Sequence, residues 1–270
     1  RHIFENIRAI LDASGYEILV LEADKIIKAL TIYMSSAENP ADGVMFAATL
    51  AKSIIDKFHD GGMSDWVIYF PLVVGSISGL LTRPENIALP ASSTLKELIN
   101  GHIDGEKFLT GKKQAVDDEA LSSSEYEAVT AICLVFENML LSSSGYPNDH
   151  VLANLSVMFL KLGEVLDFCA KGIILKLADW MNVASGGAYD TKNLQECIGS
   201  AVIAMGPEKL LALLPISLNK KDFSVSNSWL IPVLNKYICG SSLGFFMKHV
   251  VPLAVTFEQA SSKVKKSVIR

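Results

Sequence analysis

Length, composition and charge narrow the possibilities for this chain. Its 270 residues are 50% hydrophobic and 20% charged, so it has enough apolar material to form a core and is not globally disordered. The formal net charge of -5 excludes a domain that binds the phosphate backbone of nucleic acid over a large basic surface. Any contact with nucleic acid must therefore be local. Two domains and one elongated repeat stack both fit this length.

The first predicted elements are helices. An amphipathic pattern already runs from Arg1, with no signal-peptide pattern before it, and we expect the sequence to be a fragment of something longer. Helices are predicted near residues 17–36 and 43–59. A breaker segment at 38–43 separates them, and Gly61 and Gly62 end the second.

The uncharged run Trp66–Thr82 is the segment to consider for a membrane span. It is shorter than the roughly 20 apolar residues that a bilayer core requires. It also contains Pro71, Gly75 and Gly79, which favour a helix packed against protein. We therefore expect no membrane association.

Residues 101–122 interrupt the helical pattern. Their glycines and mixed charge predict a polar loop or disordered insertion. Ser122–Ser124 and Glu125 then supply an N-cap and a first turn for the next helix. The expected organisation is N-terminal helical repeats over 1–100, the insertion over 101–122, and C-terminal helical repeats over 123–270.

Helical stripes continue after the insertion, near residues 123–141, 149–169 and 191–205. The strongest stripe has apolar residues at three- and four-residue steps: Val151, Leu152, Leu155, Met158, Phe159, Leu162, Val165, Leu166 and Cys169. Asn154 matches a glycosylation sequon but lies inside this pattern, so we expect no glycan there. No comparably long alternation of apolar and polar residues supports strands.

Helix pairs recur about every 40 residues, which is the period of HEAT-type repeats. Stripes this wide cannot be buried within one pair, so each pair must cover its neighbour. The sequence therefore predicts an all-α fold, a HEAT/armadillo-type α-solenoid of antiparallel helix pairs.

A search for catalytic or metal-binding patterns finds none. The five histidines are scattered singly, without the spacing that would bring two of them to one metal. Gly111-Lys112 resembles the end of a P-loop, but Glu106 and Lys113 occupy the places of its first glycine and its hydroxyl. Residues 75–79 resemble a serine nucleophile elbow, but the serines stand at the wrong places.

The acidic run 117–119 lies in the polar insertion, where nothing would desolvate it. We therefore expect no enzyme, no cofactor, no metal and no small-molecule substrate. An enzyme whose site is spread over distant helices is the remaining catalytic alternative. The four cysteines sit among apolar residues without a C-x-x-C pair, which predicts buried, reduced thiols in an intracellular protein.

Two groups of basic residues are candidates for contact with RNA or a partner: Lys220 and Lys221, and Lys263, Lys265, Lys266 and Arg270. Ordinary solvated lysines are the alternative interpretation. No aromatic residues are interleaved with them, so they do not form a stacking platform for single strands.

The C-terminal third carries the most specific motifs. They are Gly206-Pro207-Glu208, Leu213-Leu214-Pro215-Ile216-Ser217-Leu218, Trp229-Leu230-Ile231-Pro232-Val233-Leu234, Leu243-Gly244-Phe245-Phe246 and Val251-Pro252-Leu253-Ala254. Their residues are suited to packing. We expect Pro207 in the first turn of a helix. We expect Pro215, Pro232 and Pro252 to stop or bend helices. Trp229, Phe245 and Phe246 are expected to fill the wedge between adjacent repeats.

This order of motifs, over about residues 200–257, resembles the ribosomal RNA-processing protein 12 family of large HEAT-repeat ribosome-assembly factors. The resemblance implies a non-catalytic scaffold in ribosome biogenesis, acting in pre-rRNA processing and in assembly or export of the small-subunit precursor. It implies assembly proteins, pre-ribosomal particles and pre-rRNA as partners. It also implies a place in the nucleus and nucleolus, with shuttling to the cytoplasm.

Paired helices alone are equally compatible with a karyopherin-like nuclear transport receptor or another HEAT-repeat interaction scaffold. The Leu-Leu-Pro motif at 213–215 and the Trp-Leu-Ile-Pro motif at 229–232 favour the ribosome-assembly interpretation.

Overall fold

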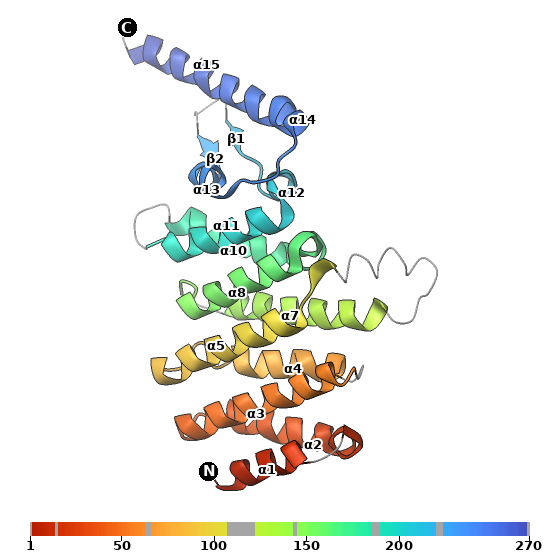
Figure 1. Cartoon of the computed structure of the whole chain (residues 1–270). Coiled ribbons are helices and arrows are strands. Elements are labelled where there is room, and N and C mark those ends of the chain that lie inside the picture. The colour runs from red at the N-terminus through yellow and green to blue at the C-terminus, as the bar shows by residue number, and fades with distance from the viewer. Residues whose placement is uncertain are drawn as a thin grey trace.

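The computed structural model describes residues 2–13, 16–62, 66–106, 122–142, 145–184, 190–219 and 224–268. The helices of the stack are α1 (His2–Ala13), α2 (Tyr16–Ser35), α3 (Ala41–Asp60), α4 (Trp66–Ser78), α5 (Glu85–His102), α7 (Ser122–Ser142), α8 (Asp149–Leu162), α9 (Leu166–Cys169), α10 (Lys171–Ala184) and α11 (Lys192–Met205). They pile up along one axis, with the two ends of the chain at opposite ends of the stack (Figure 1). The predicted all-α solenoid is confirmed.

The stack has two layers. Helices α2, α4, α7 and α10 contact one another in succession and form the first layer. Helices α1, α3, α5, α8 and α11 form the second, which continues into α13 (Leu230–Tyr237). Most helices also contact the next helix in the chain across the layers, as α2 contacts α3 and α10 contacts α11. Each repeat therefore covers its neighbour, as expected for a solenoid.

One hydrophobic core runs along the whole stack, between the layers. The residues of the apolar stripes seen in the sequence are buried in this core. In α8, for example, Leu155, Met158 and Phe159 are fully buried. In α4, the uncharged helix, Val67, Phe70 and Val74 face the core. In the described part of the chain, no helix is both long and apolar enough to cross a membrane.

Arg83 connects the first two repeats. Its guanidinium donates to three backbone carbonyls at the end of α2, with distances of 3.3 Å to Met34, 2.8 Å to Ser35 and 3.0 Å to Ser36. The last carbonyls of a helix have no partner within the helix. Arg83 therefore caps α2 from the loop that leads into α5 and fixes the spacing of these repeats.

Asn154 links α8 to α5 inside the second layer. It is fully buried, and its Nδ2 donates to Ser92 Oγ at 2.8 Å and to the His150 carbonyl at 2.7 Å. A glycan could not be attached to this side chain in the folded chain, which agrees with the expectation that the sequon is unused. At the exposed start of the same helix, His150 Nε2 lies 3.0 Å from Glu85 Oε2.

The prediction of one continuous helix over 149–169 is wrong. Helix α8 ends at Leu162, and Gly163 has a φ of 54°, which takes the backbone out of the right-handed helical region. A 3₁₀ turn (Gly163–Val165) and the short α9 follow. The apolar spacing continues through the break, so the pattern alone did not reveal it.

The C-terminal part is arranged differently from the stack. It contains α12 (Pro207–Leu213), a small antiparallel hairpin of β1 (Ser217–Leu218) and β2 (Val225–Ser226), then α13, α14 (Leu243–Phe245), a π-helical turn (Phe246–Val250) and α15 (Val251–Val268). The hairpin was not expected from the sequence. Its strands are two residues long, so they are too short to show alternation.

The predicted insertion and the division into 1–100, 101–122 and 123–270 stay predictions. Residues 107–121, most of the insertion, lie outside the described residues. Helix α5, which precedes the insertion, packs against α8, the second helix after it.

Candidate interaction surfaces

Three of the predicted basic residues lie on the last helix of the chain. Lys263, Lys265 and Lys266 fall on the last turns of α15, which projects from the stack at the top of Figure 1. Lys220, Lys221 and Arg270 lie outside the described residues. A contact of these residues with RNA or a partner stays a prediction.

The four motif prolines do not all lie where they were expected. Pro207 is the first residue of α12, where its missing N–H costs nothing, and Pro215 follows the end of that helix. Pro232 lies in the first turn of α13, so the expectation that it stops or bends a helix is wrong. Pro252 is the second residue of α15, directly after the π turn 246–250. The wider π turn gives the proline ring room within an otherwise continuous helix.

Trp229 lies between the stack and the C-terminal part. It immediately precedes α13, is 9% exposed, and belongs to the core together with Leu230 and Val233. Its indole Nε1 donates to Asn182 Oδ1 of α10 at 2.8 Å. One end of this ring is therefore packed and the other is held by a hydrogen bond, the usual arrangement of a buried tryptophan.

An apolar groove of about 380 Å³ lies between α12 and the helix formed by α14, the π turn and α15. Its lining comes almost entirely from the C-terminal motifs and their neighbours: Glu208, Leu211, Ala212, Pro215, Ile216, Phe245, His249, Val250 and Leu253. The Phe245 and His249 rings stack with centroids 4.9 Å apart. We call this feature the C-terminal groove.

Ser242 holds the two walls of the C-terminal groove together. Its hydroxyl donates to Glu208 Oε1 of α12 at 2.7 Å and accepts from the Phe245 N–H at 3.2 Å. It is thus the N-cap of α14 and a link to α12 at the same time. Phe245 and Pro215, two motif residues that lie far apart in the sequence, both line the groove that this link holds together.

Phe246 does not fill a wedge within this chain. It is 45% exposed, and Leu243 and Met247 beside it are also exposed, whereas Phe245 is half-buried. Successive residues of a helix point about 100° apart, so the two rings cannot face the same groove. The expectation that Phe246 packs between repeats of this chain is therefore wrong.

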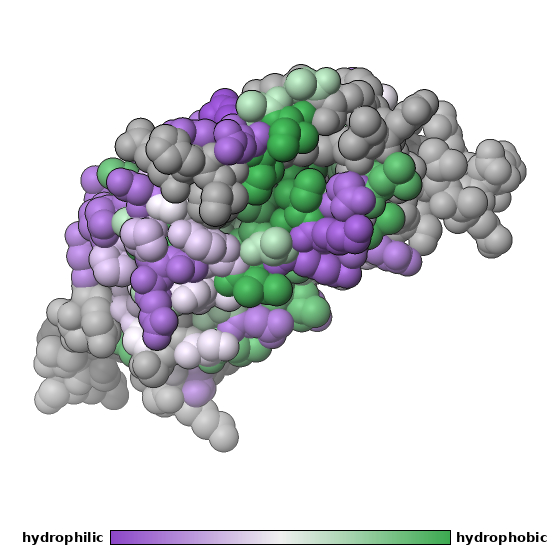
Figure 2. All heavy atoms as spheres, turned by 90° about the horizontal axis from the view of Figure 1, so that it is seen from below, coloured by the Kyte–Doolittle hydropathy of each residue, from purple (hydrophilic) through white to green (hydrophobic). Residues whose placement is uncertain are grey.

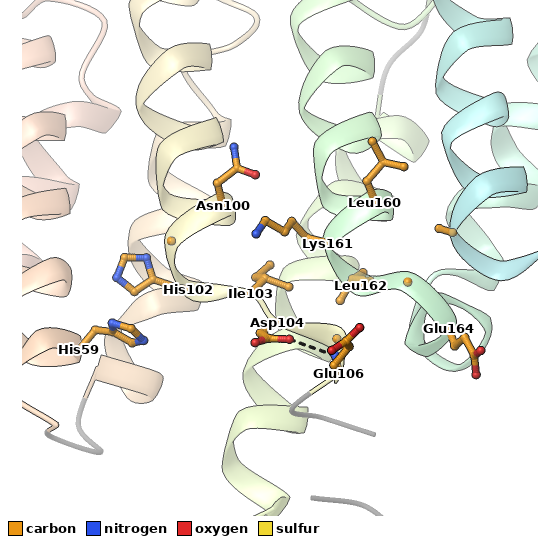
Figure 3. Close-up of a pocket in the computed structure, with 14 residues that line it drawn as sticks. His59, Asn100, His102, Ile103, Asp104, Glu106, Leu160, Lys161, Leu162 and Glu164 are labelled. Atoms are coloured by element: carbon orange, nitrogen blue, oxygen red, sulfur yellow. Dashed lines mark hydrogen bonds between the residues drawn. The ribbon is translucent and has the colours of Figure 1, made fainter. Parts of the chain in front are cut away.

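A second, polar pocket of about 680 Å³ opens where the C-terminal ends of α5 and α8 meet (Figure 3). Asp104, Glu106 and Glu164 contribute carboxylates and Lys161 an ammonium group. Asp104 Oδ1 accepts from the Glu106 N–H at 3.1 Å. The carbonyl ends of two helices add partial negative charge. The pocket therefore favours positively charged groups.

His102 is one of the residues that line this pocket, and its ring is directed toward His59 (Figure 3). Its Nδ1 lies 2.9 Å from the Leu98 carbonyl and its Nε2 lies 3.4 Å from Asp56 Oδ1. The ring packs against three aromatic rings, with centroid distances of 4.8 Å to His59, 5.3 Å to Phe70 and 5.7 Å to Trp66. Burial lowers the pKa of His102, and the Leu98 hydrogen bond and the Asp56 charge oppose this effect only in part.

These contacts give His102 a structural role. Because the Leu98 carbonyl can only accept, Nδ1 carries the proton in the neutral ring, and Nε2 faces Asp56. Both ring nitrogens thus face groups of the protein itself, whereas a general acid or base directs one nitrogen at its substrate. Among the described residues, no group of three or more His, Cys, Asp or Glu is placed to hold a metal ion.

The N-terminal end of the stack presents a third surface. Viewed along the stack axis from this end, hydrophobic residues form a band with hydrophilic residues on both sides (Figure 2). Ile10 of α1 and Leu21 of α2 are among the exposed large hydrophobic residues of the first helices. A contiguous apolar surface of this kind is suited to contact with another protein surface.

Sequence reasoning missed both hollows, because their linings come from distant positions. In the C-terminal groove, Glu208 lies on α12 and Phe245 on α14; in the polar pocket, His59 lies on α3 and Lys161 on α8. No local spacing relates these pairs. The C-terminal motifs were the usable signal for the C-terminal groove, since their residues line it; the polar pocket has no comparable signal.

Comparison with known proteins gives a family match. The family model described as "Ribosomal RNA-processing protein 12, HEAT repeats" matches residues 82–269, which is more than half of the chain. The match includes α5 through α15, the C-terminal groove, the polar pocket except His59, and all of the C-terminal motifs.

Curated relatives carry similar names. An RRP12-like protein of Gallus gallus is 26% identical over 239 residues, or 87% of this chain and 18% of the relative. The putative ribosomal RNA-processing protein 12 of Schizosaccharomyces pombe is 41% identical over 30% of this chain and 7% of its own length. Ribosomal RNA-processing protein 12 of Saccharomyces cerevisiae is 30% identical over 36% of this chain and 8% of its own length. The chain thus spans less than a fifth of these relatives.

Proposed function

Because this chain belongs to the ribosomal RNA-processing protein 12 family, we propose that it is a non-catalytic helical-repeat scaffold in ribosome biogenesis. Its work would be in pre-rRNA processing and in the assembly or export of the small-subunit precursor. The names of the relatives state ribosomal RNA processing, and this supports the proposal.

The observation that carries the proposal is the coincidence of the family match with a continuous two-layer helical stack. In a solenoid each repeat contacts only its neighbours, so most of its length is available as surface. The match extends over the C-terminal groove and, apart from His59, over the polar pocket. Both are hollows in which a partner segment can be held without any chemical step.

The two hollows suit different partner groups. The C-terminal groove offers Leu211, Ile216 and Leu253, which fit an apolar side chain of an assembly protein. The polar pocket, with three carboxylates to one ammonium group, fits a lysine or arginine side chain. Assembly proteins and pre-ribosomal particles are the partners we propose, in the nucleus and nucleolus.

A non-catalytic role is supported by the arrangement of the polar residues. His102 is held by Leu98 and Asp56 and covered by aromatic rings. The chain would then contribute by holding other components in position.

Affinity purification of the full-length parent protein tests the proposal. We expect small-subunit precursor RNA and nucleolar assembly proteins to be recovered with it. Recovery of soluble cargo that a small GTPase releases, without precursor RNA, would contradict it and support a karyopherin-like receptor. A variant with Leu211→Asp and Leu253→Asp in the C-terminal groove should recover fewer assembly proteins. An Ile231→Asp variant, changed at an exposed residue of α13, serves as the control.

A further inference from the structure

The first turn of the last helix presents an apolar face to solvent, on the helix that projects at the top of Figure 1. Leu243 is 76% exposed, Phe246 45% and Met247 56%. These residues are three and four positions apart, so they lie on one side of the helix. The Phe246 N–H donates to the Ser242 carbonyl at 3.1 Å, which shows that the regular helical step holds through this turn. We call Leu243, Phe246 and Met247 the solvent-facing patch.

The exposure is concentrated at this end of the helix. The exposed residues from 258 to 262 are polar, whereas Ile238 and Cys239, in the loop before the patch, are exposed as well. The prediction of four buried cysteines is therefore wrong for Cys239. Full burial of a large apolar side chain contributes about 1.5–3 kcal/mol. A group of such side chains left in water is typical of an interaction site.

Gly244, within the same turn, is a glycine that the fold of this chain does not require. Its φ is not positive, and a Cβ added there would meet nothing within 4 Å. Glycine in a helix costs about 1 kcal/mol relative to alanine. Gly244 precedes Met247 by three positions and Lys248 by four, so it borders the patch. A glycine in this place lets the backbone of another molecule come close to the helix.

The segment that carries the patch is basic, although the chain as a whole is acidic. No Asp or Glu occurs from residue 223 to residue 257, whereas the whole chain has 29 of them. The same segment contains Lys236, Lys248 and His249. Lys248 directly follows Met247 and is exposed. Carboxylates of a partner would therefore meet a complementary charge beside the patch.

We propose that the solvent-facing patch docks an acidic amphipathic helix of another protein. Leucine or phenylalanine side chains of that helix would cover the patch, a small residue would lie against Gly244, and a Glu or Asp would pair with Lys248. This inference names a partner class for the scaffold proposed above and rests on that proposal. Leu243 and Met247 are aliphatic, which favours a protein partner, since a single-stranded RNA would need several aromatic rings to stack its bases.

Two labelled peptides of about 20 residues test the proposal by fluorescence anisotropy with the full chain. Both carry leucine at positions i, i+3, i+4 and i+7, flanked by glutamates in one peptide and by lysines in the other. We expect the acidic peptide to bind with a Kd in the micromolar range, because the patch is small. The lysine peptide should bind at least about tenfold more weakly. Equal binding of the two, or no binding of the acidic peptide at about 100 µM chain, would overturn the proposal.

Variants of the full chain locate the binding site. Phe246→Asp and Gly244→Gln should each weaken binding of the acidic peptide by about tenfold or more. Glutamine at 244 meets open space in the chain and favours a helix, so this variant should fold at least as well as the wild type. Lys248→Glu should remove the preference for the acidic peptide. The control is Leu89→Asp, at an exposed residue of α5, which should bind normally.

Unchanged binding in both Phe246→Asp and Gly244→Gln would overturn the proposal. A single-stranded RNA that displaces the acidic peptide, and whose own binding the same two variants abolish, would identify the patch as an RNA surface and overturn it as well. Peptide binding is measured without ribosomal particles. It can therefore fail while the parent protein still recovers precursor RNA, so failure of this inference is distinguishable from failure of the proposed scaffold role.

Discussion

The indole Nε1 of Trp229 donates to Asn182 Oδ1 at 2.8 Å and thereby joins the start of α13 to the end of α10. The two residues are 47 positions apart, and one belongs to the C-terminal motifs while the other lies in the last turn of α10, a helix of the first layer. The motif tryptophan therefore holds the C-terminal part against the stack.

Replacing Trp229 should show how much of this connection is packing. For Trp229→Ala we expect a loss of about 3–5 kcal/mol in the free energy of unfolding, because a large buried side chain leaves a cavity. Trp229→Phe keeps most of the apolar contact and loses the hydrogen bond. The lost bond should lower the free energy of unfolding by about 0.5–1.5 kcal/mol, and the smaller cavity should add to this decrease. Urea unfolding measures both. Equal losses would show that packing does not dominate.

Helix α8 offers a matched test of the buried stripe. Leu155 is 0% exposed and Leu160 is 50% exposed on the same helix. Leu155→Asp places an unpaired carboxylate in the core and should unfold or aggregate the chain. Leu160→Asp should change stability by less than about 1 kcal/mol. Circular dichroism melts of the two variants provide the comparison, and unchanged melting of Leu155→Asp would contradict the assigned core.

Two glycines near the end of α5 should respond oppositely to alanine. A Cβ on Gly105 would overlap the backbone carbonyl of Leu162, so Gly105→Ala must displace the chain where α5 meets α8. A Cβ on Gly101 would meet nothing within 4 Å. Gly101→Ala should therefore stabilise the helix by up to about 1 kcal/mol. We expect opposite shifts in the urea midpoint, and a neutral Gly105→Ala would contradict this close approach.

Stability should depend on pH through His102. Burial lowers its pKa below the ordinary 6.5, although Asp56 opposes this, while His59 and Lys52 add to it. The folded state then binds this proton more weakly than the unfolded state. The contribution to stability is therefore complete above about pH 6.5 and is lost as the pH falls below it. Urea midpoints from pH 7.5 to 5.5 should fall more steeply for the wild type than for His102→Phe.

Contact of the C-terminal lysines with RNA would be electrostatic. For binding of a single-stranded pre-rRNA fragment we expect affinity to fall steeply as salt rises. The double change Lys263→Glu and Lys266→Glu should weaken binding and reduce the salt slope by about one for each lost phosphate contact. The control is Lys25→Glu with Lys28→Glu, at the other end of the stack. Salt-independent binding, or equal effects of both pairs, would contradict this prediction.

Much of the fold follows from local patterns. The predicted helices near 17–36, 43–59, 123–141 and 191–205 agree with α2, α3, α7 and α11 to within two residues. Such helices have wide stripes that the solenoid buries. The break at Gly163 escaped prediction, because apolar residues keep helical spacing on both sides of it and one glycine within a pattern is ambiguous.

The surfaces were less accessible to sequence reasoning. A proline inside a helix disturbs it, whereas a proline in the first turn does not. Pro232 lies in the first turn of α13, and the sequence did not show where that helix starts. Phe245 and Phe246 look alike in sequence, but the register of their helix turns one to the C-terminal groove and the other to solvent. His102 had no visible partner, because Asp56 reaches it from another helix.

The most direct test of the scaffold role is sedimentation of the full-length parent protein from cell extract on a sucrose gradient, with the precursor RNAs measured in each fraction. The account predicts that the protein travels with small-subunit precursor RNA and that the Leu211→Asp, Leu253→Asp variant shifts toward the top of the gradient. A wild-type protein that stays at the top, separate from precursor RNA, would contradict it.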